Sequence, residues 1–413
     1  MTEIVRPETT EQAEQAMAYA VSENMPVMIE GQGTKQRLGR PVQAAMTINT
    51  TALSGITLYE PEELVLSARA GTPLAEIEKA LDDKNQMMAF EPADYAALFG
   101  GEPGSGTIGG LVNCNLAGSR RISQGAARDH VLGVAVVTGR GETIKSGGRV
   151  VKNVTGYDLS KLVTGSYGTL GLLTDVTIKV LPRPECCWTL MIQGLDDAKA
   201  IAALSRGLGS SHEVSGAAHL PADIAGQSGV TVVAKADGPV TLLRIEGPLP
   251  SVEARAKGLT QDLESFGPAI RLETDEARPL WAEVTNARAF AGTGDDPLWR
   301  ISMKPTDGPK LTAGLESLGQ TGRCFYDWGG GLVWFAPDAA VSLETAKALR
   351  QRVDAMGGHA TLIRSNTATR QTVPVFHPQS PALGALSDRV KQSFDPKGLI
   401  NPGRMTDSAA LAA

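Results

Sequence analysis

The sequence predicts an α+β protein of two parts, and three observations carry this prediction. Residues 100–184 are dense in glycine, with short β-branched runs such as His130–Thr138 between the glycines. From residue 185 glycine thins out, and strand-like and helix-like segments alternate. That rhythm, with antiparallel pairs, is typical of a sheet that carries helices on one face. At 413 residues the chain has room for two domains.

The first elements are expected to be a helix, a strand and a glycine-rich loop. Residues 8–24 predict a helix, because a capping box precedes apolar residues at helical spacing. Residues 26–30 predict a strand that runs into the loop Gly31–Gly39. Successive small residues there let several backbone N–H groups converge on an anion. A β-turn with solvated Lys35 and Arg37 is the alternative for this loop.

Three strands and a helix should separate this loop from the glycine-dense stretch. In that stretch, repeated glycine indicates backbone at positive φ, or backbone pressed against something that leaves no room for a Cβ. Tight backbone alternating with strands favours a flat, phosphate-bearing ligand that lies across the strand ends. The expected strands are 45–49, 56–59 and 64–70, and the helix is 74–83, with Pro73 at its first position.

The stretch also contains a pattern that imitates a dinucleotide fingerprint. Residues Gly104–Gly109 fit G-x-G-x-x-G, with Asp129 at about the spacing of a ribose-binding acid. A true fingerprint follows directly on a hydrophobic strand and opens a helix. Here Pro103 precedes the first glycine, and Gly118 should interrupt any helix that starts at Thr107. The NAD interpretation is therefore rejected.

The part after residue 185 is expected to alternate strands and helices, and a strand pair should turn at Gly329–Gly331. A proline- and glycine-punctuated loop then follows the last helix. The expected strands are 188–192, 240–245, 299–303, 324–328, 332–335 and 359–363, and the expected helices are 196–206, 251–266, 305–318, 339–356 and 380–394.

Composition argues against several classes of function. A net charge of −6 disfavours a nucleic-acid or anionic-membrane surface. No apolar run approaches the roughly 20 residues of a membrane span, and the polar N-terminus has no apolar signal core. The four cysteines lack C-x-x-C or zinc-like spacing. We expect a cytoplasmic chain with reduced thiols and no structural metal.

Seven segments of the chain resemble the vanillyl-alcohol-oxidase/PCMH superfamily of FAD-binding oxidoreductases. The last two narrow the resemblance to the E-subunit type of bacterial glycolate oxidase (glycolate dehydrogenase), while GEPGSG ahead of Thr107 departs from the family pattern. The segments are IEGQGTKQRLG (29–39), FEPAD (90–94), TIGGLVNCNLAGSRR (107–121), GAARDHVLGV (125–134), KNVTGYDLSKLVTGSYGTLGLLTDVTIKVLPRP (152–184), YDWGGGLVW (326–334) and FDPKGLINPGRM (394–405).

The resemblance implies a fold and a cofactor. Residues 1–184 would form a two-subdomain PCMH-type FAD-binding domain, 185–393 an α+β cap with a ferredoxin-like sheet, and 394–413 a segment returning to the FAD domain. FAD is expected without a covalent link, its pyrophosphate held by backbone N–H groups of the loop 31–35. The implied FAD-binding residues are Gly31, Gln32, Gly33, Thr34, Lys35, Pro92, Thr107, Ile108, Gly109, Gly110, Asn113, Gly118, Gly125, Asp129, Leu173 and Thr174.

The same comparison shows what this chain lacks. Family members that oxidise 2-hydroxy acids without partner subunits carry an H-x-x-G-D-G-N-x-H-like segment that binds a metal. This chain has five histidines, of which only His212 and His219 lie close together in sequence, without an acidic pattern between them. No metal is assigned, and the catalytic residues stay unknown. Cys114 lies near the expected flavin, but packing is favoured over covalent attachment.

The resemblance therefore implies an FAD-binding subunit of a complex that oxidises glycolate, a 2-hydroxy acid, to glyoxylate. Its partners would be a sister FAD-binding catalytic subunit and an iron–sulfur subunit, with no nucleic acid and no transmembrane segment. The expected location is the cytoplasm, with peripheral attachment to the inner membrane through the partners as a further option. The alternatives are a free-standing FAD-dependent hydroxy-acid or alcohol dehydrogenase, and a non-catalytic scaffold of this fold.

Overall fold

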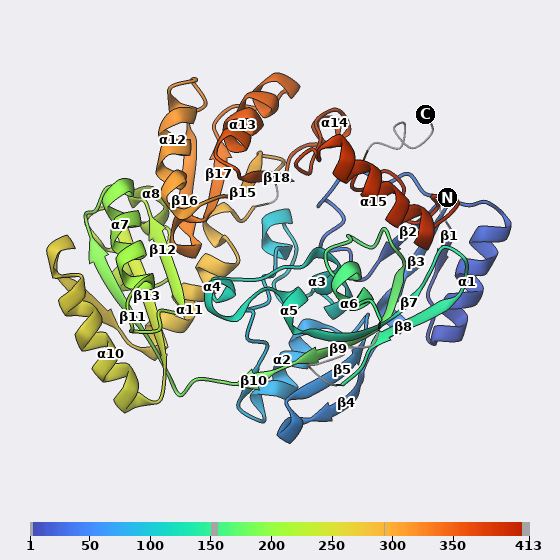
Figure 1. The fold of residues 1–413 in the computed structure, drawn as a ribbon, viewed down its shortest axis with the longest axis horizontal. Coiled ribbons are helices and arrows are strands. Elements are labelled where there is room, and N and C mark those ends of the chain that lie inside the picture. Colours follow the sequence, from blue (N-terminus) through green and yellow to red (C-terminus); the bar gives the residue numbers. More distant parts are fainter. Residues whose placement is uncertain (1–2, 150–155, 293, 407–413) are drawn as a thin grey trace. The chain divides into compact units, whose positions relative to one another are not determined.

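The computed structural model describes residues 3–149, 156–292 and 294–406, and these fall into two compact units (Figure 1). We call them unit 1 and unit 2. Part of the family-like segment 152–184 and the end of the segment 394–413 lie outside the described residues. This division into units does not test the domain limits expected at residues 184 and 393, which stay predictions. Unit 1 takes its residues from 1–117, 125–182 and 374–413, and unit 2 from 118–124 and 183–373.

Unit 1 begins with a small parallel sheet in the order β1-β3-β2. Helix α1 connects β1 to β2, which lie on opposite sides of β3 and both pair with it in parallel. It begins after Thr9, whose hydroxyl accepts the N–H of Gln12, so the helix predicted from the capping box is confirmed. The bounds are Glu3–Val5 for β1, Thr10–Ser22 for α1, Val27–Glu30 for β2 and Met46–Asn49 for β3.

A second, antiparallel sheet completes unit 1 in the order β4-β5-β9-β7-β8. Its strand β7 is buried along its whole length, which accounts for the unbroken apolar run VLGVAVV. Helix α1 contacts β3 of the first sheet and both β7 and β9 of the second, so one core joins the two sheets. The bounds are β4 Ile56–Glu60, β5 Val65–Arg69, β7 Val131–Val137, β8 Thr143–Gly147 and β9 Leu172–Lys179.

Short elements surround these sheets, and two differ from expectation. Pro73 is the N-cap of α2 and not its first helical residue. Gly118 does not prevent a helix after Thr107, because the short α3 ends at Cys114, before that glycine is reached. The bounds are α2 Leu74–Asp82, α3 Ile108–Cys114, α5 Ala127–His130, α6 Leu159–Val163, α15 Pro381–Phe394, and the paired strands β6 Gln86–Met87 and β10 Leu181–Pro182.

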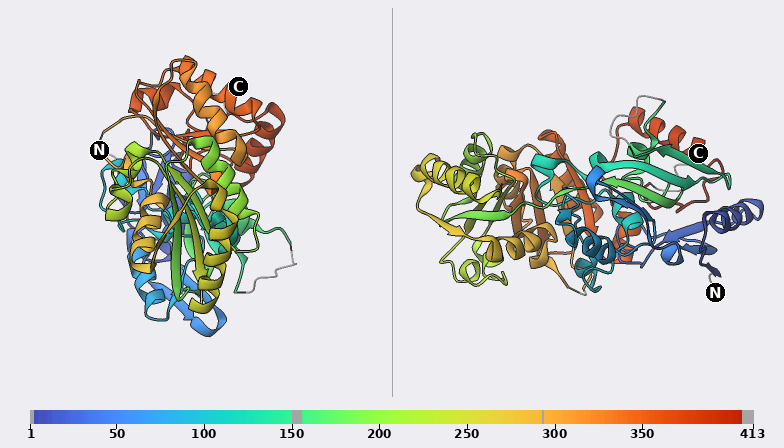
Figure 2. Two further views of the ribbon diagram at one scale, coloured as in Figure 1. Left: turned by 90° about the vertical axis from the view of Figure 1, so that its left-hand side faces the viewer. Right: turned by 90° about the horizontal axis from the view of Figure 1, so that it is seen from below.

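Unit 2 is built on an eight-stranded antiparallel sheet in the order β14-β11-β13-β12-β16-β17-β15-β18. Helices α7 and α10 contact each other, and both pack on β13 (Figure 1, Figure 2). The α+β class with a sheet-based cap is thereby confirmed. The strands are β11 Cys186–Gln193, β12 Gly216–Leu220, β13 Val240–Gly247, β14 Ala269–Leu272, β15 Leu298–Ser302, β16 Gly322–Asp327, β17 Leu332–Pro337 and β18 His359–Arg364.

Several elements of unit 2 were not expected from the sequence. Strand β12 has the sequence GAAHL, without the β-branched residues that mark a strand. Helix α11 contains Pro279, which disfavours a helix interior. The helices are α4 Arg121–Gln124, α7 Asp197–Leu208, α8 Ala222–Ala225, α9 Thr231–Ala234, α10 Leu249–Asp262, α11 Thr274–Thr285, α12 Gly308–Glu316, α13 Leu343–Ala355 and α14 Thr367–Thr372.

Strands β16 and β17 form the predicted hairpin, and its turn is strained at one residue. Trp328 has a φ of +54°, in the left-handed region that bulky residues avoid. The carboxylate of Asp327 accepts the N–H of Trp328 at 2.7 Å, and glycines follow at 329 and 330 with positive φ. Across the described chain, no helix is long and apolar enough to cross a membrane.

Candidate cofactor site

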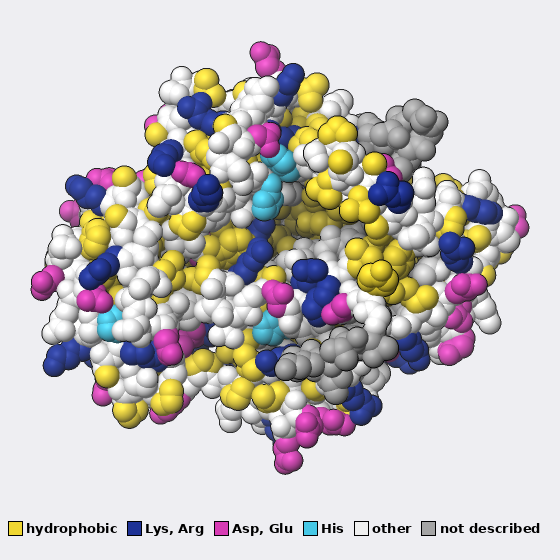
Figure 3. Space-filling model, in the orientation of Figure 1, with side chains coloured by type: hydrophobic (Ala, Val, Ile, Leu, Met, Phe, Trp, Pro, Cys, Tyr) yellow, Lys and Arg dark blue, Asp and Glu magenta, His cyan; other side chains and the backbone are white. Residues whose placement is uncertain are grey.

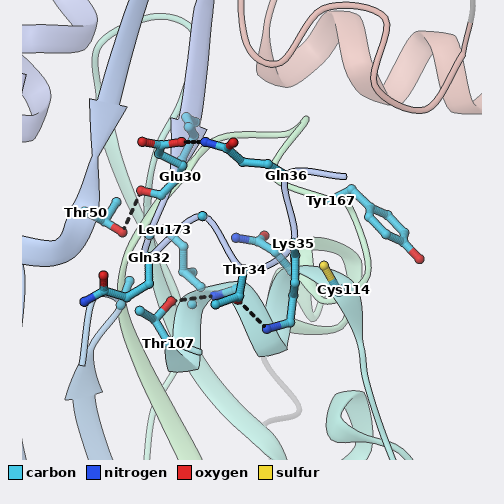
Figure 4. A pocket seen from close by; sticks show the side chains of 18 of the residues that line it. Glu30, Gln32, Thr34, Lys35, Gln36, Thr50, Thr107, Cys114, Tyr167 and Leu173 are labelled. Carbon is cyan, nitrogen blue, oxygen red and sulfur yellow. Dashed lines mark hydrogen bonds between the residues drawn. The ribbon is translucent and has the colours of Figure 1, made fainter. Parts of the chain in front are cut away.

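A cleft in unit 1 lies where β2 ends and α3 begins (Figure 4). It is lined by the loop 31–36, by α3, by the turn at Tyr167 and Gly168, and by residues near the C-terminus. It encloses about 670 Å³, counting space open to solvent. Concave sites of this kind are where proteins bind small molecules and cofactors.

The loop after β2 presents its backbone to this cleft. Gly33 has a φ of +75°, which glycine adopts without steric cost. The N–H of Gln36 donates to the carbonyl of Gly33 at 3.1 Å and closes a tight turn. Within the described chain, the N–H groups of Gln32, Gly33 and Thr34 donate no hydrogen bond. Successive N–H groups of this kind are suited to bind an anion.

Two adjacent glycines at the start of α3 are needed for different reasons. A Cβ on Gly109 would lie 2.7 Å from the carbonyl oxygen of Ala70, so this glycine permits close packing within the protein. A Cβ on Gly110 would meet only the Thr107 hydroxyl, at 3.4 Å, so nothing in the protein excludes a side chain there. Gly110 also lines the cleft. Its missing side chain therefore leaves space in the cleft itself.

The turn at Tyr167 forms one wall of the cleft. Tyr167 has a φ of +54°, and its N–H donates to the carbonyl of Asn113 at 2.8 Å. Its ring packs edge-on against Phe376, with the ring centroids 4.5 Å apart. The amide of Asn401 donates to the carbonyl of Gly168 at 3.0 Å. Contacts from three parts of the chain hold this wall, so its shape is preorganised.

The C-terminal segment supplies a second wall. Ile400 pairs with Val27 in a parallel bridge, and the N–H of Ile29 donates to the Asn401 side chain at 3.0 Å. Both Asn401 and Arg404 line the cleft. Sequence reasoning did not name these two as site residues. The available signal was the family-like segment 394–405, which contains both.

Arg404 carries the strongest polar feature of the cleft. Its Nη1 donates to the carbonyl of Leu38 at 2.9 Å, but its buried Nε has no hydrogen-bond partner in the described chain. Burial lowers the pKa of Arg404, and Cys114 and Glu30 act in the opposite direction. A buried donor left without an acceptor costs about 1–3 kcal/mol. An anionic ligand in the cleft would provide the acceptor.

Lys35 and Cys114 also face the cleft (Figure 4). The Nζ of Lys35 donates to the Thr34 hydroxyl at 3.3 Å. Burial raises the pKa of the Cys114 thiol, while Lys35 and Arg404 act to lower it. The net shift is upward, so the thiol stays protonated near neutral pH, and protonated thiols are poor nucleophiles. A protonated thiol carries no charge, so Lys35 and Arg404 do not form an ion pair with Cys114.

The fit to FAD rests on three features of the cleft: the N–H groups of the loop 31–35, the unpartnered Nε of Arg404, and the space beside Gly110. Aimed donors and a cation suit a pyrophosphate, and the open position at Gly110 leaves room for part of a flat ring system. Of the sixteen residues predicted to bind FAD, those that line the cleft are Gly31, Gln32, Gly33, Thr34, Lys35, Thr107, Gly109, Gly110, Asn113 and Leu173.

The other predicted residues have different surroundings. Asp129 accepts the N–H of Ala126 at 2.8 Å at the start of α5, and a Cβ on Gly125 would lie 2.7 Å from that carboxylate. The hydroxyl of Thr174 donates to the carbonyl of Ala135 at 3.3 Å. The contacts of these residues with FAD stay predictions. The predicted FAD-binding residues that do not line the cleft are Pro92, Ile108, Gly118, Gly125, Asp129 and Thr174. Of these, Gly118 belongs to unit 2.

Comparison with known proteins places these features in a family. Residues 2–147 match the model of a family described as an FAD binding domain. Over 386 residues the chain is 36% identical to the glycolate oxidase subunit GlcE of Escherichia coli, covering 94% of either chain. It is 30% identical over 189 residues to the glycolate oxidase subunit GlcD of Bacillus subtilis, covering 46% of this chain and 38% of GlcD.

A solved structure shares the fold over nearly the whole chain. The crystal structure of p-cresol methylhydroxylase with substrate bound superimposes with a TM-score of 0.70. The match covers 98% of this chain and 89% of that enzyme, at 16% sequence identity. At that identity the likeness shows a common architecture and carries no information about the substrate.

Proposed function

The chain belongs to the FAD-binding PCMH-type oxidoreductases, and from that premise we propose that it is the FAD-binding subunit of a complex that oxidises glycolate to glyoxylate. The proposal is supported above all by the similarity to GlcE, which extends over both units of the chain. Bound FAD would supply a two-electron acceptor, and the partner subunits would take the electrons onward.

The residues of the cleft have distinct roles in this proposal. The N–H groups of the loop 31–35 would bind the pyrophosphate, and Arg404 would hold a negative charge of the cofactor. Gly110 would leave room for the ring system, and Tyr167 and Asn401 would fix the wall beside it. None of these residues is assigned a proton-transfer step. The proposal is thus about cofactor binding, with the substrate chemistry on the sister FAD-binding subunit.

Surface features also support a subunit. On α15, the side chains of Leu383 and Leu386 are each about half exposed, and hydrophobic side chains gather over this helix (Figure 3). Leu162 of α6, also in unit 1, is partly exposed as well. Exposed apolar side chains that gather on one helix, as on α15, are typical of a surface that is covered in an assembly. The proposed partners are the sister flavoprotein and an iron–sulfur protein, and the proposed location is the cytoplasm.

Reconstitution tests this function. The purified chain should show the absorbance bands of oxidised flavin, yet turn over glycolate or D-lactate negligibly with an artificial dye acceptor. Adding the sister flavoprotein and the iron–sulfur subunit should restore turnover. Substantial turnover by the chain alone would instead identify a free-standing hydroxy-acid dehydrogenase. A colourless chain that still assembles with its partners would identify a scaffold.

A further inference from the structure

The edge of the unit 2 sheet has one polar, accessible face. Along β15, Trp299 and Ile301 are buried in the core, whereas Arg300 and Ser302 are only partly buried. Side chains alternate between the two faces of a strand, so Arg300 and Ser302 share the face away from that core. On the β17 side, the buried residues Trp334 and Leu332 lie opposite Arg300 and Ser302, so this face is polar only toward the β18 edge.

The neighbouring edge strand β18 adds to the same face. Thr361 lies opposite Arg300 in the antiparallel register, and His359 lies opposite Ser302. Directly opposed residues of two antiparallel strands point to the same face. Thr361 is partly exposed and His359 is exposed. A cation, two hydroxyl groups and an imidazole are thus side by side on an accessible strip.

A fixed indole extends this strip. The guanidinium carbon of Arg300 lies 4.9 Å from the centroid of the Trp328 ring, and that of Arg121 lies 4.6 Å from the same ring. The indole N–H of Trp328 donates to the carbonyl of Gly118 at 3.1 Å, which holds the ring in place. All these residues belong to unit 2. One rigid ring therefore positions two guanidinium groups.

The charge of Arg300 is not balanced within the described chain. The guanidinium of Arg300 has neither a hydrogen bond nor an ion pair there, and its Nε is buried without an acceptor. Elsewhere in unit 2, Arg120 and Arg244 share the carboxylate of Glu246. Burial of the Nε of Arg300 without an acceptor is costly, and an anion beside this guanidinium would supply the acceptor. A planar carboxylate is the anion whose geometry matches a guanidinium, through two parallel hydrogen bonds.

We propose that Arg300, Arg121 and Trp328 form a binding site for a small carboxylate anion on unit 2. The hydroxyl groups of Thr361 and Ser302 lie on the same face and can accept or donate a hydrogen bond to a second polar group of the ligand. A small 2-hydroxy acid or its 2-oxo product has both groups. That choice of ligand rests on the proposed function, whereas the anion site itself does not.

Calorimetric titration of the full FAD-loaded chain tests the site. The probes are oxalate and glycolate, with ethylene glycol as the uncharged control. Oxalate and glycolate should bind and ethylene glycol should not, and R300Q should weaken the binding by about 10- to 100-fold. R121Q should weaken it by a smaller factor, because Arg121 is more exposed and its charge is better screened. K304Q, an exposed charge of unit 2, should leave the affinity unchanged.

Three results would overturn the site: no heat from either anion, equal binding of ethylene glycol, or equal affinity in R300Q and the unmutated chain. Circular dichroism and flavin absorbance of R300Q check that the variant is folded. Tryptophan fluorescence gives an independent signal, since an anion beside the indole should change the emission, and W328F should remove that change. Turnover of the reconstituted complex is measured separately. Binding without turnover rejects glycolate oxidation and leaves the anion site standing.

Discussion

The notable features of unit 1 are formed by backbone groups, whereas those of unit 2 are formed by charged side chains. In unit 1 the candidate site is mostly backbone, with unpaired N–H groups in the loop 31–35 and an open position at Gly110. In unit 2 the notable features are charged side chains, half-buried or fully buried, that meet across strands. Glycine patterns are local in sequence, whereas charge networks join distant residues. The two units should therefore respond differently to substitution.

Glu246 is the centre of the network in unit 2. Its carboxylate accepts two hydrogen bonds from Arg120, one of them at 2.9 Å from Nε, and lies 3.3 Å from Nε of Arg244. The hydroxyl of Ser215 donates to it at 2.6 Å. Burial alone would raise the pKa of Glu246, but Arg244 and then Arg120 outweigh burial and hold that pKa at about 2. The network thus fixes the segment 118–124 within unit 2.

The largest expected effect is the loss of this carboxylate. E246Q removes the carboxylate that Arg120 and Arg244 share and should lower the free energy of unfolding by about 3–5 kcal/mol. Denaturant titration measures it, with the exposed E264Q as the matched control. A loss below about 1 kcal/mol would mean that unit 2 does not depend on its charge network.

The free energy of unfolding measured against pH should also reveal the contribution of Glu246. The pKa of Glu246 is about 2 in the folded chain, against an ordinary 4.5. Because the folded chain holds this carboxyl ionised more strongly than the unfolded chain does, the group stabilises the fold at pH values above its unfolded-state pKa. The contribution is complete above about pH 4.5 and is lost as the pH falls toward 2. The shift corresponds to about 3 kcal/mol. In E246Q, the fall in stability over this pH window should be smaller by that amount.

The next effect separates binding from folding in unit 1. G110V places a branched side chain in the cleft, and we expect at least about a 100-fold loss of FAD affinity with the apo-chain still folded. G109A should instead destabilise the fold, because its Cβ would lie 2.7 Å from the carbonyl of Ala70. Flavin fluorescence and circular dichroism measure the pair. Full flavin occupancy in G110V would remove the cleft from consideration as the cofactor site.

Arg404 is a charged side chain on which the candidate site of unit 1 relies. R404Q should weaken FAD binding about tenfold, since one charge-assisted hydrogen bond is lost. Arg389, exposed on α15, provides the control variant R389Q. If the charge faces the reduced flavin, the reduction potential should also fall. An unchanged affinity together with an unchanged potential would show that Arg404 contacts no part of the cofactor.

The smallest effect concerns Cys114. With its thiol pKa raised by burial, it should form no bond to the flavin. Acid precipitation should therefore leave the yellow colour in the supernatant for both the unmutated chain and C114S. Colour that remains in the pellet of the unmutated chain and disappears from the pellet of C114S would establish a covalent link.

The contrast between the units also explains which features could be predicted from the sequence and which could not. The helix α1, the loop after β2 and the glycines of α3 carry local signals, because capping and positive φ depend on neighbouring residues. Asn401 escaped notice as a site residue because its partner Ile29 lies 372 positions earlier. The Arg120–Glu246 pair likewise depends on two segments whose proximity no local pattern encodes. Strand β12 was missed because its partners, and not its own residues, make it a strand.

The pairing of Ile400 with Val27 sets the order of events during synthesis. The ribosome adds about 5–20 residues per second, so the first strands of unit 1 emerge tens of seconds before the last segment exists. Until Ile400 has been added, the nascent chain has only part of the cleft wall. FAD loading should therefore wait for residues 400–404, and a chain truncated just before Ile400 should lose the site although the loop 31–35 is intact.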